Sequence, residues 1–420
     1  MLKLLSQRKI FYGWWVVLAC SGISVLGSAS YMYGFTVFFL PLSADLNLSR
    51  AAASLVFSTV RLEGGLGGPA VGWFIDRFGP GRSQFIGAAI TGLGFLLLSR
   101  VDSFLTLFLV YALVIGVGFN LGLGSPGMAA ANAWFIRRKA TAIGMISTGF
   151  GIGGVLVPLL SLLVLNYGWR YAVVVVGLTY WLAIMPLSLA VRRSPESMGL
   201  RPDGLSTAEW DSAVKEAMGT GVGYADFSPL QALKTPSFWA MAAGMSLFFA
   251  VHSGVIVHLV PLLVDKGLSL QTAAGMIALL ALINAPMRLA MGWLGDRWPK
   301  RSLLIMASLV GSGALALMLF ATSIVHIYIF IILWAVAYSC NHLHWSMLGQ
   351  YYGRKNFAKI RGFADMSRVL LVVSSPVFAG RVYDVSGSYR AAIIVFAGAF
   401  VLAALFYSMA KPPHLKDAPT

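Results

Sequence analysis

The chain has 420 residues, of which 58% are hydrophobic and only 11% are charged, and its mean hydropathy is +0.79. A soluble domain needs a larger polar surface than this, so the composition excludes an ordinary soluble enzyme and indicates an integral membrane protein. The net charge of +16 lies in short clusters between long apolar runs, a pattern that fits membrane-protein loops and argues against nucleic acid as a partner.

The apolar runs are long enough to be membrane spans, since a helix needs about 20 apolar residues to cross the hydrocarbon core. The first run continues to Leu40 without a cleavage pattern, so we expect a retained span and not a signal peptide. Cys20 and Cys340 fall inside spans and are expected to be small packing residues. The twelve expected spans are 13–40, 51–75, 83–101, 104–133, 140–166, 169–191, 237–264, 270–294, 302–322, 325–351, 360–382 and 389–410.

One long polar segment, 192–235, divides these spans into six and six. It is too short to bury a core of its own, which makes it a linker and not a catalytic domain. The sequence therefore predicts an all-α membrane protein of twelve transmembrane helices in two six-helix bundles. The N-terminal bundle is expected at 1–191, the cytoplasmic linker at 192–235, and the C-terminal bundle with a cytoplasmic tail at 236–420.

Lysine and arginine are unevenly shared between the two sets of loops, and the richer set faces the cytoplasm in most membrane proteins. The set that includes the linker and both termini holds most of these residues. We therefore expect both termini to be cytoplasmic, in a multi-pass protein of the cell's inner (plasma) membrane. The basic residues of the poorer set are Arg50, Arg100, Arg170, Lys266, Arg381 and Arg390.

A short loop sequence occurs once in each half, as GWFIDRF at 72–78 and GWLGDRW at 292–298, which indicates a duplicated transporter bundle. Asp76 and Asp296 are placed to interact with a helix N-terminus or a neighbouring arginine. Together with Arg77 and Arg297 they are expected to pin the bundles in one transport state. The alternative is an orientation anchor without a gating role.

The loop Gly72-x3-Asp76-Arg77-x-Gly79-x2-Arg82 resembles the signature between the second and third spans of the major facilitator superfamily. The copy after the eighth span lies where that superfamily carries its second signature. The resemblance covers the whole chain and implies a secondary transporter that works by alternating access. No metal-ligand spacing, phosphate loop or nucleophile constellation occurs, so no cofactor, metal or enzymatic activity is expected.

A finer resemblance links the chain to bacterial relatives of the monocarboxylate transporters and oxalate/formate exchangers. It implies a small organic anion as substrate and places Arg288 where that family keeps its substrate-coordinating arginine. Tyr33 and Asn284 replace the lysine and aspartate of the animal transporters, which leaves proton symport through another group or anion exchange. The segments that carry the resemblance are Phe11–Val17, Thr36–Phe39, Trp134-Phe135-x-Arg137-Arg138-x5-Gly144 and Asn284-x3-Arg288.

Ionisable side chains inside the spans are costly, at about 2.5–3.5 kcal/mol each at a helix centre, and are functional candidates by default. Arg288 lies one turn from Asn284, with Pro286 between them, so a cation and an amide converge. A guanidinium can hold a carboxylate by two parallel hydrogen bonds. The alternative is permanent pairing of Arg288 with an internal acid. The five ionisable residues are Arg61, Glu63, Arg288, Asp365 and Arg368.

Arg368 offers a second cation, which would favour a dicarboxylate if it faces the cavity with Arg288. Asp365 lies three residues before Arg368 and can neutralise it along the same helix face. Glu63 precedes the small-residue run Gly64–Gly68, which suits close helix packing. Glu63, Asp365 or a histidine is also a candidate for handling a coupled proton.

Polar and aromatic residues suggest further parts of a site. Tyr338, His342 and Trp345 form a stripe in the tenth span that suits either a carboxylate site or ordinary packing. His258, near the outer end of the seventh span, is a candidate sensor of external pH or a headgroup-facing histidine. Tyr33 is equally suited to cavity lining and packing, whereas Asn120 is a substrate-site candidate in a glycine-rich segment that favours packing.

The leading interpretation is a carrier of monocarboxylates such as lactate and pyruvate, or of dicarboxylates, that works as a monomer in the lipid bilayer. Its coupling partner is expected to be a proton or a counter-anion. One alternative is a major-facilitator exporter of hydrophobic or drug-like compounds, in which the arginines are structural. Another is a membrane sensor that uses this fold without transporting.

Overall fold

The computed structural model describes residues 11–48, 56, 59–60, 62–206, 209, 212 and 226–413. Eleven helices within these residues are long and apolar enough to cross a membrane. The predicted second span falls partly outside the described residues, and its described end is α4, Gly68–Phe78. The apolar runs thus form helices, because no water is present in a bilayer to hydrogen-bond an exposed backbone.

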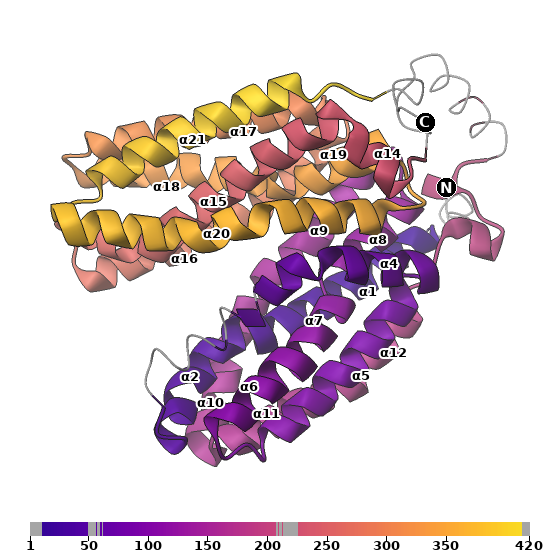
Figure 1. The fold of residues 1–420 in the computed structure, drawn as a ribbon, viewed down its shortest axis with the longest axis horizontal. Helices are drawn as coiled ribbons and strands as arrows, with labels where there is room; N and C mark the ends of the chain where they lie inside the picture. Colours follow the sequence, from indigo (N-terminus) through magenta and orange to yellow (C-terminus); the bar gives the residue numbers. More distant parts are fainter. Residues whose placement is uncertain are drawn as a thin grey trace, which may run out of the picture.

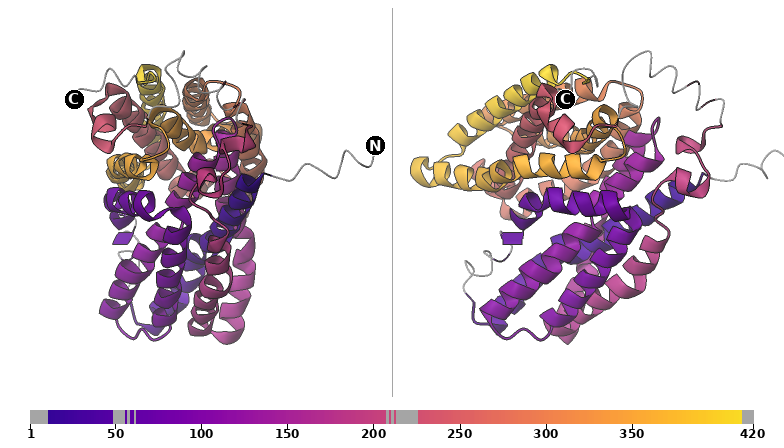
Figure 2. Two further views of the ribbon diagram at one scale, coloured as in Figure 1. Left: turned by 90° about the vertical axis from the view of Figure 1, so that its right-hand side faces the viewer. Right: turned by 45° about the vertical axis from the view of Figure 1, so that its right-hand side comes forward.

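The helices gather into two bundles that meet at one end and diverge at the other (Figures 1 and 2). The N-terminal bundle contains α1 Tyr12–Gly27, η2 Ser28–Tyr33, α2 Gly34–Asp45, α4, α5 Pro80–Leu98, α6 Phe104–Phe108, η3 Leu109–Gly116, α7 Val117–Gly122, α8 Ser125–Trp134, α9 Lys139–Ile152, η4 Gly153–Leu156, α10 Val157–Tyr167, α11 Trp169–Thr179, η5 Tyr180–Ile184 and α12 Met185–Leu189.

The C-terminal bundle has longer uninterrupted helices, and short linker helices precede it. The linker helices are η6 Pro195–Met198, η7 Pro202–Gly204 and α14 Pro229–Lys234. The bundle contains α15 Pro236–Asp265, α16 Leu270–Gly295, α17 Lys300–Leu319, α18 Ile324–Ser339, η8 Cys340–His342, α19 Leu343–Tyr352, α20 Phe357–Ser386 and α21 Arg390–Met409.

The fourth span is broken near its middle. Gly124 has a φ of 75°, and α8 begins beyond it with Pro126 in its first turn. A proline has no backbone N–H and a glycine tolerates positive φ, so the pair ends one helix and begins the next. At the break, the carbonyl of Gly124 accepts the N–H of Met128 at 3.2 Å and also a hydrogen bond from Arg361 of the other bundle at 3.4 Å. A backbone acceptor is thereby turned toward the centre of the molecule.

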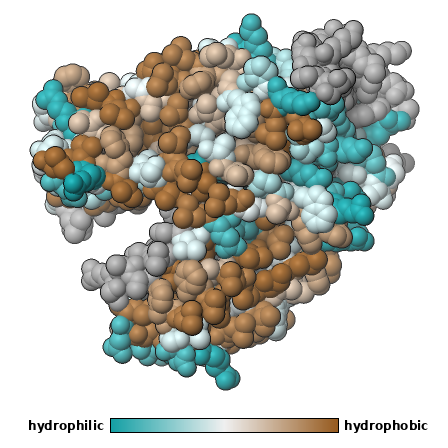
Figure 3. All heavy atoms as spheres, viewed as in Figure 1, coloured by the Kyte–Doolittle hydropathy of each residue, from teal (hydrophilic) through white to brown (hydrophobic). Residues whose placement is uncertain are grey.

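We call the end where the bundles meet the linker side, because α1 begins and α21 ends there and both described parts of the linker lie there. The opposite end is the open side, where a space-filling view shows a hollow between the bundles (Figure 3). Hydrophobic side chains cover the flanks of both bundles, and hydrophilic ones gather on the linker side. This distribution fits a protein whose flanks face lipid.

Each end of the linker is fastened to one bundle by an aspartate. Asp203 accepts hydrogen bonds from the N–H groups of Ile136 and Arg137, both at 2.8 Å, just before α9. Asp226 accepts from the N–H groups of Arg354 at 2.6 Å and Lys355 at 2.9 Å, just before α20. The linker therefore braces the two loops that lead into α9 and α20.

Candidate functional site

Asp296 joins the bundles on the linker side. It follows the last residue of α16, and its carboxylate accepts the backbone N–H groups of Ala140 at 2.7 Å and Thr141 at 3.0 Å. The Thr141 hydroxyl also donates to it, at 2.6 Å. These donors lie in the first turn of α9, where unpaired N–H groups and the helix dipole favour an anion. A carboxylate of the C-terminal bundle thus caps a helix of the N-terminal bundle.

Asp76 makes the reciprocal contact from the end of α4. Its carboxylate accepts the N–H groups of Ala358 at 3.2 Å and Lys359 at 2.9 Å, in the first turn of α20. Burial raises the pKa of Asp76 to about 6, opposed by these hydrogen bonds and by the charge of Lys359. Burial likewise raises the pKa of Asp296, against the hydrogen bonds from Thr141 and Ala140. At pH 7 the Asp76 carboxyl is therefore mainly ionised and able to act as an acceptor.

The arginines of the two loops lie apart from these contacts. Arg77 and Arg297 are exposed, and the guanidinium of Arg297 lies 3.8 Å from the ring centroid of Trp293 on its own helix. Both aspartates lie at helix N-termini, and Asp76 also has a neighbouring arginine, Arg193 of the linker, which donates to its backbone carbonyl at 3.0 Å. A gating role for the four residues stays a prediction.

Glycines bring the bundles into backbone contact beside the aspartates. A Cβ added at Gly362 of α20 would collide with the backbone of Gly68 and Pro69, and one at Gly72 of α4 with the backbone of Ala358. A Cβ at Gly292 of α16 would lie 3.0 Å from the carbonyl oxygen of Ala140, in the pseudo-equivalent α9–α16 contact. Small residues permit this approach, as in many membrane helix pairs.

Polar side chains complete the seal on the linker side. Asn132 donates to the carbonyl of Gly353 at 3.2 Å, and the Lys139 ammonium donates to the carbonyl of Gly349 at 3.0 Å. Arg354 donates to the carbonyl of Ala133 and pairs with Glu196 of the linker at 2.9 Å. All of these bonds except the Glu196 pair join α8 or α9 to residues near the end of α19, so the linker side is closed in this state.

Removing both aspartate caps should open the linker side. An N-cap substitution by alanine costs about 0.5–2 kcal/mol, so the Asp76→Ala/Asp296→Ala double variant should lose about 2 kcal/mol of closed-state stability, a shift of about 30-fold. Labelling of a cysteine introduced on the linker side by a membrane-impermeant maleimide should rise accordingly. The control, Asp384→Asn at the exposed open-side end of α20, should label like the parent. Unchanged labelling of the double variant would contradict a gating role.

Arg288 lies between the bundles, about half-buried, and is held by polar groups rather than by an acid. Its Nε donates to Oδ1 of Asn284 at 2.6 Å, and its Nη1 donates to the carbonyl of Ser147 in α9 at 2.7 Å. Asn284 is oriented in turn by its bond to the carbonyl of Ala335, at 3.3 Å. The ring centroid of Tyr338 lies 5.4 Å from the guanidinium carbon. Asn284, Arg288 and Tyr338 are therefore brought together.

No acid within the described ranges pairs with Arg288. Those ranges contain four ion pairs, and none includes this arginine. Asp365 is engaged elsewhere, and Glu63 forms no ion pair in the described part of the chain. The permanent internal pairing that the sequence left open is therefore absent from this part of the structure.

Two histidines lie near this arginine. His252 of α15 stacks on Tyr338 with ring centroids 3.3 Å apart, and the charge of Arg288 acts on both His252 and His342. His342 forms part of η8, where its Nδ1 lies 3.0 Å from the carbonyl of Ser339. Because η8 interrupts the tenth span, the predicted stripe divides: Tyr338 lies near Arg288, whereas Trp345 lies with other cations.

The second set of charges lies on one face of α20. Asp365 pairs with Arg368 at 2.5 Å and with Arg361 at 3.4 Å. The guanidinium of Arg361 lies 4.2 Å from the ring centroid of Trp345, and that of Arg368 lies 4.5 Å from that of Phe249. Arg368 is thus neutralised by Asp365, which was the alternative to a free second cation. The cluster keeps a single net positive charge from Arg361.

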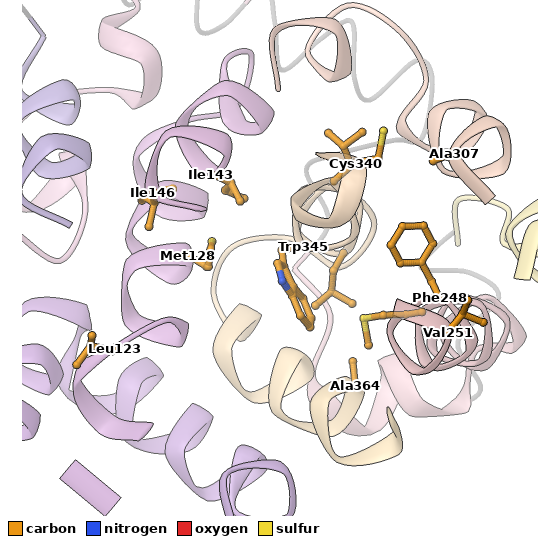
Figure 4. Close-up of a cluster of buried hydrophobic side chains, with 14 of the residues drawn as sticks. Leu123, Met128, Ile143, Ile146, Phe248, Val251, Ala307, Cys340, Trp345 and Ala364 are labelled. Atoms are coloured by element: carbon orange, nitrogen blue, oxygen red, sulfur yellow. The ribbon is translucent and has the colours of Figure 1, made fainter. Parts of the chain in front are cut away.

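Trp345 marks where this cluster meets the other bundle. Figure 4 shows its ring between Met128 and Ile143 of the N-terminal bundle and Phe248 of the C-terminal bundle. It is 5% exposed and stacks loosely on Phe249, with centroids 6.5 Å apart. The Trp345 ring therefore lies between the arginines of this cluster and the facing N-terminal bundle.

The remaining candidates do not converge on Arg288 in the described part of the structure. Glu63 has a buried Oε2 without a hydrogen-bond partner there, and a Cβ at Gly116 would lie 3.0 Å from it. The side-chain amide of Asn120 packs against Gly64, 2.7 Å from where a Cβ would stand. Both contacts are of the helix-packing kind. The side chain of Tyr33 and all of Arg61 lie outside the described residues.

His258 links α15 to neighbouring helices through both of its ring nitrogens. Its Nδ1 lies 3.1 Å from the hydroxyl of Tyr389, and its Nε2 lies 2.9 Å from the carbonyl of Pro376 in α20. With both ring nitrogens engaged, it holds the open-side ends of α15 and α20 together. Its proposed role as a pH sensor stays a prediction.

Sequence reasoning missed three parts of this arrangement. Arg361 is not among the five ionisable residues that the sequence analysis places inside the spans, but it lies inside α20, is 7% exposed and shares Asp365 with Arg368. Its position one residue before Gly362 was an available signal, since that glycine marks a helix contact. The carbonyl of Ser147 and the stacking of His252 on Tyr338 leave no pattern in the sequence, because both depend on contacts between distant helices.

Comparisons with known proteins agree with this architecture. Residues 17–355 match the Major Facilitator Superfamily. The oxalate:formate antiporter of Oxalobacter formigenes is 27% identical over 314 residues, covering 73% of this chain and 69% of that protein. Monocarboxylate transporter 13 of Bos taurus is 28% identical over 399 residues, covering 93% of this chain and 87% of that protein. A solved structure of the proton:xylose symporter XylE has a TM-score of 0.72 at 17% identity, with 96% of this chain and 97% of that chain covered.

The superfamily match spans most of the chain, and the structural likeness extends over nearly all of both molecules. The fold is accordingly the all-α arrangement of twelve transmembrane helices in two bundles. The predicted fold class and the resemblance drawn from the sequence are thereby confirmed. The chain is a member of the Major Facilitator Superfamily of membrane transporters.

Proposed function

We propose that this protein is a secondary active transporter of small organic anions, chiefly monocarboxylates of the size of lactate and pyruvate. The observation that carries the proposal is Arg288, a half-buried guanidinium between the bundles with no acidic partner among the described residues. A guanidinium has five N–H donors, and the recorded bonds use one on Nε and one on Nη1. The remaining donors are suited to a carboxylate.

The charge balance around the centre supports an anionic cargo. Arg288 contributes one positive charge, and the Arg361–Asp365–Arg368 cluster contributes another. Charges in a low-dielectric interior are costly unless they are paired, so an anion that enters between the bundles meets a favourable potential. A single carboxylate satisfies Arg288. A dicarboxylate would need a second contact from the Arg361–Asp365–Arg368 cluster, in which Asp365 already engages both arginines.

The relatives point in the same direction. One is named an oxalate:formate antiporter and the other a monocarboxylate transporter, so both names refer to small carboxylates. We infer the same substrate class, small carboxylates, for this chain, and the experiment below identifies the particular acid. One relative is named an antiporter, and the name of the other specifies no coupling partner. The two names together do not decide whether this chain couples transport to a proton or to a counter-anion.

From the Lys/Arg distribution we infer that the linker side faces the cytoplasm and that the protein lies in the plasma membrane. In that orientation the state described here is outward-facing, since the hollow between the bundles lies on the open side (Figure 3). Alternating access would then require the α4–α20 and α9–α16 contacts to separate while the open side closes.

Counterflow in proteoliposomes tests this proposal. Liposomes preloaded with unlabelled acid should take up radiolabelled lactate, pyruvate, oxalate or malonate in a saturable manner, and monocarboxylates should compete best. A parallel assay should show no movement of a hydrophobic cationic dye. Transport of the dye without any carboxylate would point to an exporter of drug-like compounds. No flux of either kind would leave a non-transporting membrane protein.

A further inference from the structure

His342 carries an unused hydrogen-bonding atom in the interior of the molecule. The residue is 1% exposed, and its Nδ1 lies 3.0 Å from the carbonyl of Ser339. A carbonyl only accepts, so Nδ1 carries the hydrogen and Nε2 keeps a lone pair. This Nε2 is buried and has no partner within the described residues. Leaving a buried polar atom unpaired costs about 1–3 kcal/mol, which calls for an explanation in function.

The atom lies at the contact between the bundles. A Cβ added at Gly144 of α9 would lie 3.2 Å from Nε2 of His342 and also 3.2 Å from the carbonyl oxygen of Arg288. The glycine therefore allows α9 to cover the imidazole while the linker side is closed. Separation of α9 from α16 would uncover Nε2 toward the linker side. Access of a proton to this nitrogen thus depends on the transport state.

The charges that act on His342 come from two neighbouring elements. Burial is the strongest influence on its ring, and the neighbouring groups whose charge also acts on it are Arg288 on α16 and His344 on α19. His344 is occupied on both nitrogens, by the carbonyl of Asn341 at 2.7 Å and the hydroxyl of Tyr407 at 2.5 Å. The facing part of α9 presents Gly144. After burial itself, Arg288 is therefore the neighbouring charge that most opposes a second positive charge on His342.

We propose that His342 binds the proton that is carried together with an anion on Arg288, an inference that rests on the proposed function. Without the anion, a proton on Nε2 would place a second positive charge beside Arg288 in a low-dielectric interior. A carboxylate on Arg288 offsets that charge, removes the repulsion between the guanidinium and a protonated imidazole, and so lowers the cost of protonating His342. The anion and the proton then assist each other's binding, as linkage between two sites requires.

The same arrangement gives an order of release. When α9 moves away on the linker side, water reaches Nε2 and the proton leaves to it. The carboxylate then leaves the guanidinium, which stays protonated throughout, and Nη1 loses its bond to the carbonyl of Ser147, because that carbonyl belongs to the departing helix. Only an N–H bond and hydrogen bonds change in this sequence. When the proton and the carboxylate bind together from the open side and both leave on the linker side, the net movement is of the two in the same direction.

Proton uptake on binding tests the inference. Pyruvate is added to the purified protein in a weakly buffered detergent solution. A pH-indicator dye measures proton uptake from the solution, and calorimetry measures pyruvate binding. The parent should bind pyruvate and take up about one proton per anion, as the linkage requires. The His342→Gln variant should still bind pyruvate and take up none. Its retained binding shows that it is folded, and His342→Asn provides a second variant.

Transport gives an independent readout. For coupled movement, each pH unit of inward gradient should raise the steady-state accumulation of pyruvate in proteoliposomes by about tenfold. The His342→Gln variant should exchange pyruvate by counterflow but ignore the gradient. His326→Gln, at the open-side end of α18, is the matched control and should follow the parent. Proton uptake by His342→Gln, or pyruvate binding without proton uptake in the parent, would overturn the inference and leave the proposed function intact. If the parent binds and exchanges no carboxylate, the proposed function fails first.

Discussion

Replacement of Arg288 by lysine should reduce carboxylate counterflow by about 10–100-fold. Lysine keeps the positive charge, but its compact ammonium cannot present two parallel donors or keep the bonds that the guanidinium makes to Asn284 and to the carbonyl of Ser147. A hydrogen bond to a charged group contributes about 1.5–3 kcal/mol, which corresponds to this range. Radiolabelled pyruvate exchange in proteoliposomes provides the measurement, and KM should rise more than the maximal rate falls.

Two comparison variants make the result specific to Arg288. Arg381→Lys changes an exposed arginine at the open-side end of α20 and should exchange pyruvate like the parent. Arg368→Lys should have a smaller effect than Arg288→Lys, because Asp365 already neutralises Arg368 at 2.5 Å. Equal exchange by Arg288→Lys and the parent would remove the proposed anion contact, while the fold and family would stand.

Gly362→Leu should hold the linker side open and reduce transport by at least about tenfold. A side chain at this position meets the backbone of Gly68 and Pro69, and no change of rotamer relieves a collision between a Cβ and backbone atoms. Overpacking of a tight contact costs about 1–3 kcal/mol, and in this case the cost falls only on the state in which α4 and α20 touch. The equilibrium should therefore shift toward the state with the bundles apart on this side.

Spin labels at the linker-side ends of α4 and α20 should report the shift as a longer distance distribution in Gly362→Leu. Gly398→Leu is the control, because Gly398 is exposed on α21 and has open space where a Cβ would stand. That control should keep both the parent distances and the parent rate. An unchanged distance distribution in Gly362→Leu would show that the α4–α20 contact does not govern the linker side.

The helices and the repeated loops could be predicted from the sequence because their signals are local. Apolar runs of sufficient length determine the spans, and the aspartates at 76 and 296 stand at the same place in two similar loops. The receiving helix could not be identified in this way. Asp76 meets a backbone 282 positions further along the chain, and no pattern near either residue names the other.

The central charges show the same division. The pairing of Asp365 with Arg368 follows from a spacing of three residues on one helix, which the sequence reveals. Arg361 stands at the edge of the predicted span 360–382, and the end of an apolar run is a poor guide to how deeply its flanking residues are buried. The chain continues as α20 from Phe357, and its first turns are buried by α4 and not by lipid. The unused nitrogen of His342 depends on how α9 covers η8, which only the assembled bundles reveal.

The reciprocal aspartate caps also bear on how easily the carrier can cycle. Each cap joins a carboxylate to backbone amides at the membrane surface, and both partners are well hydrated once they separate. Parting them therefore exchanges one set of hydrogen bonds for another and strands no charged group in oil. Such caps are stable while water is excluded and separate at little free-energy cost when water returns. This suits a transporter that must change conformation at every turnover.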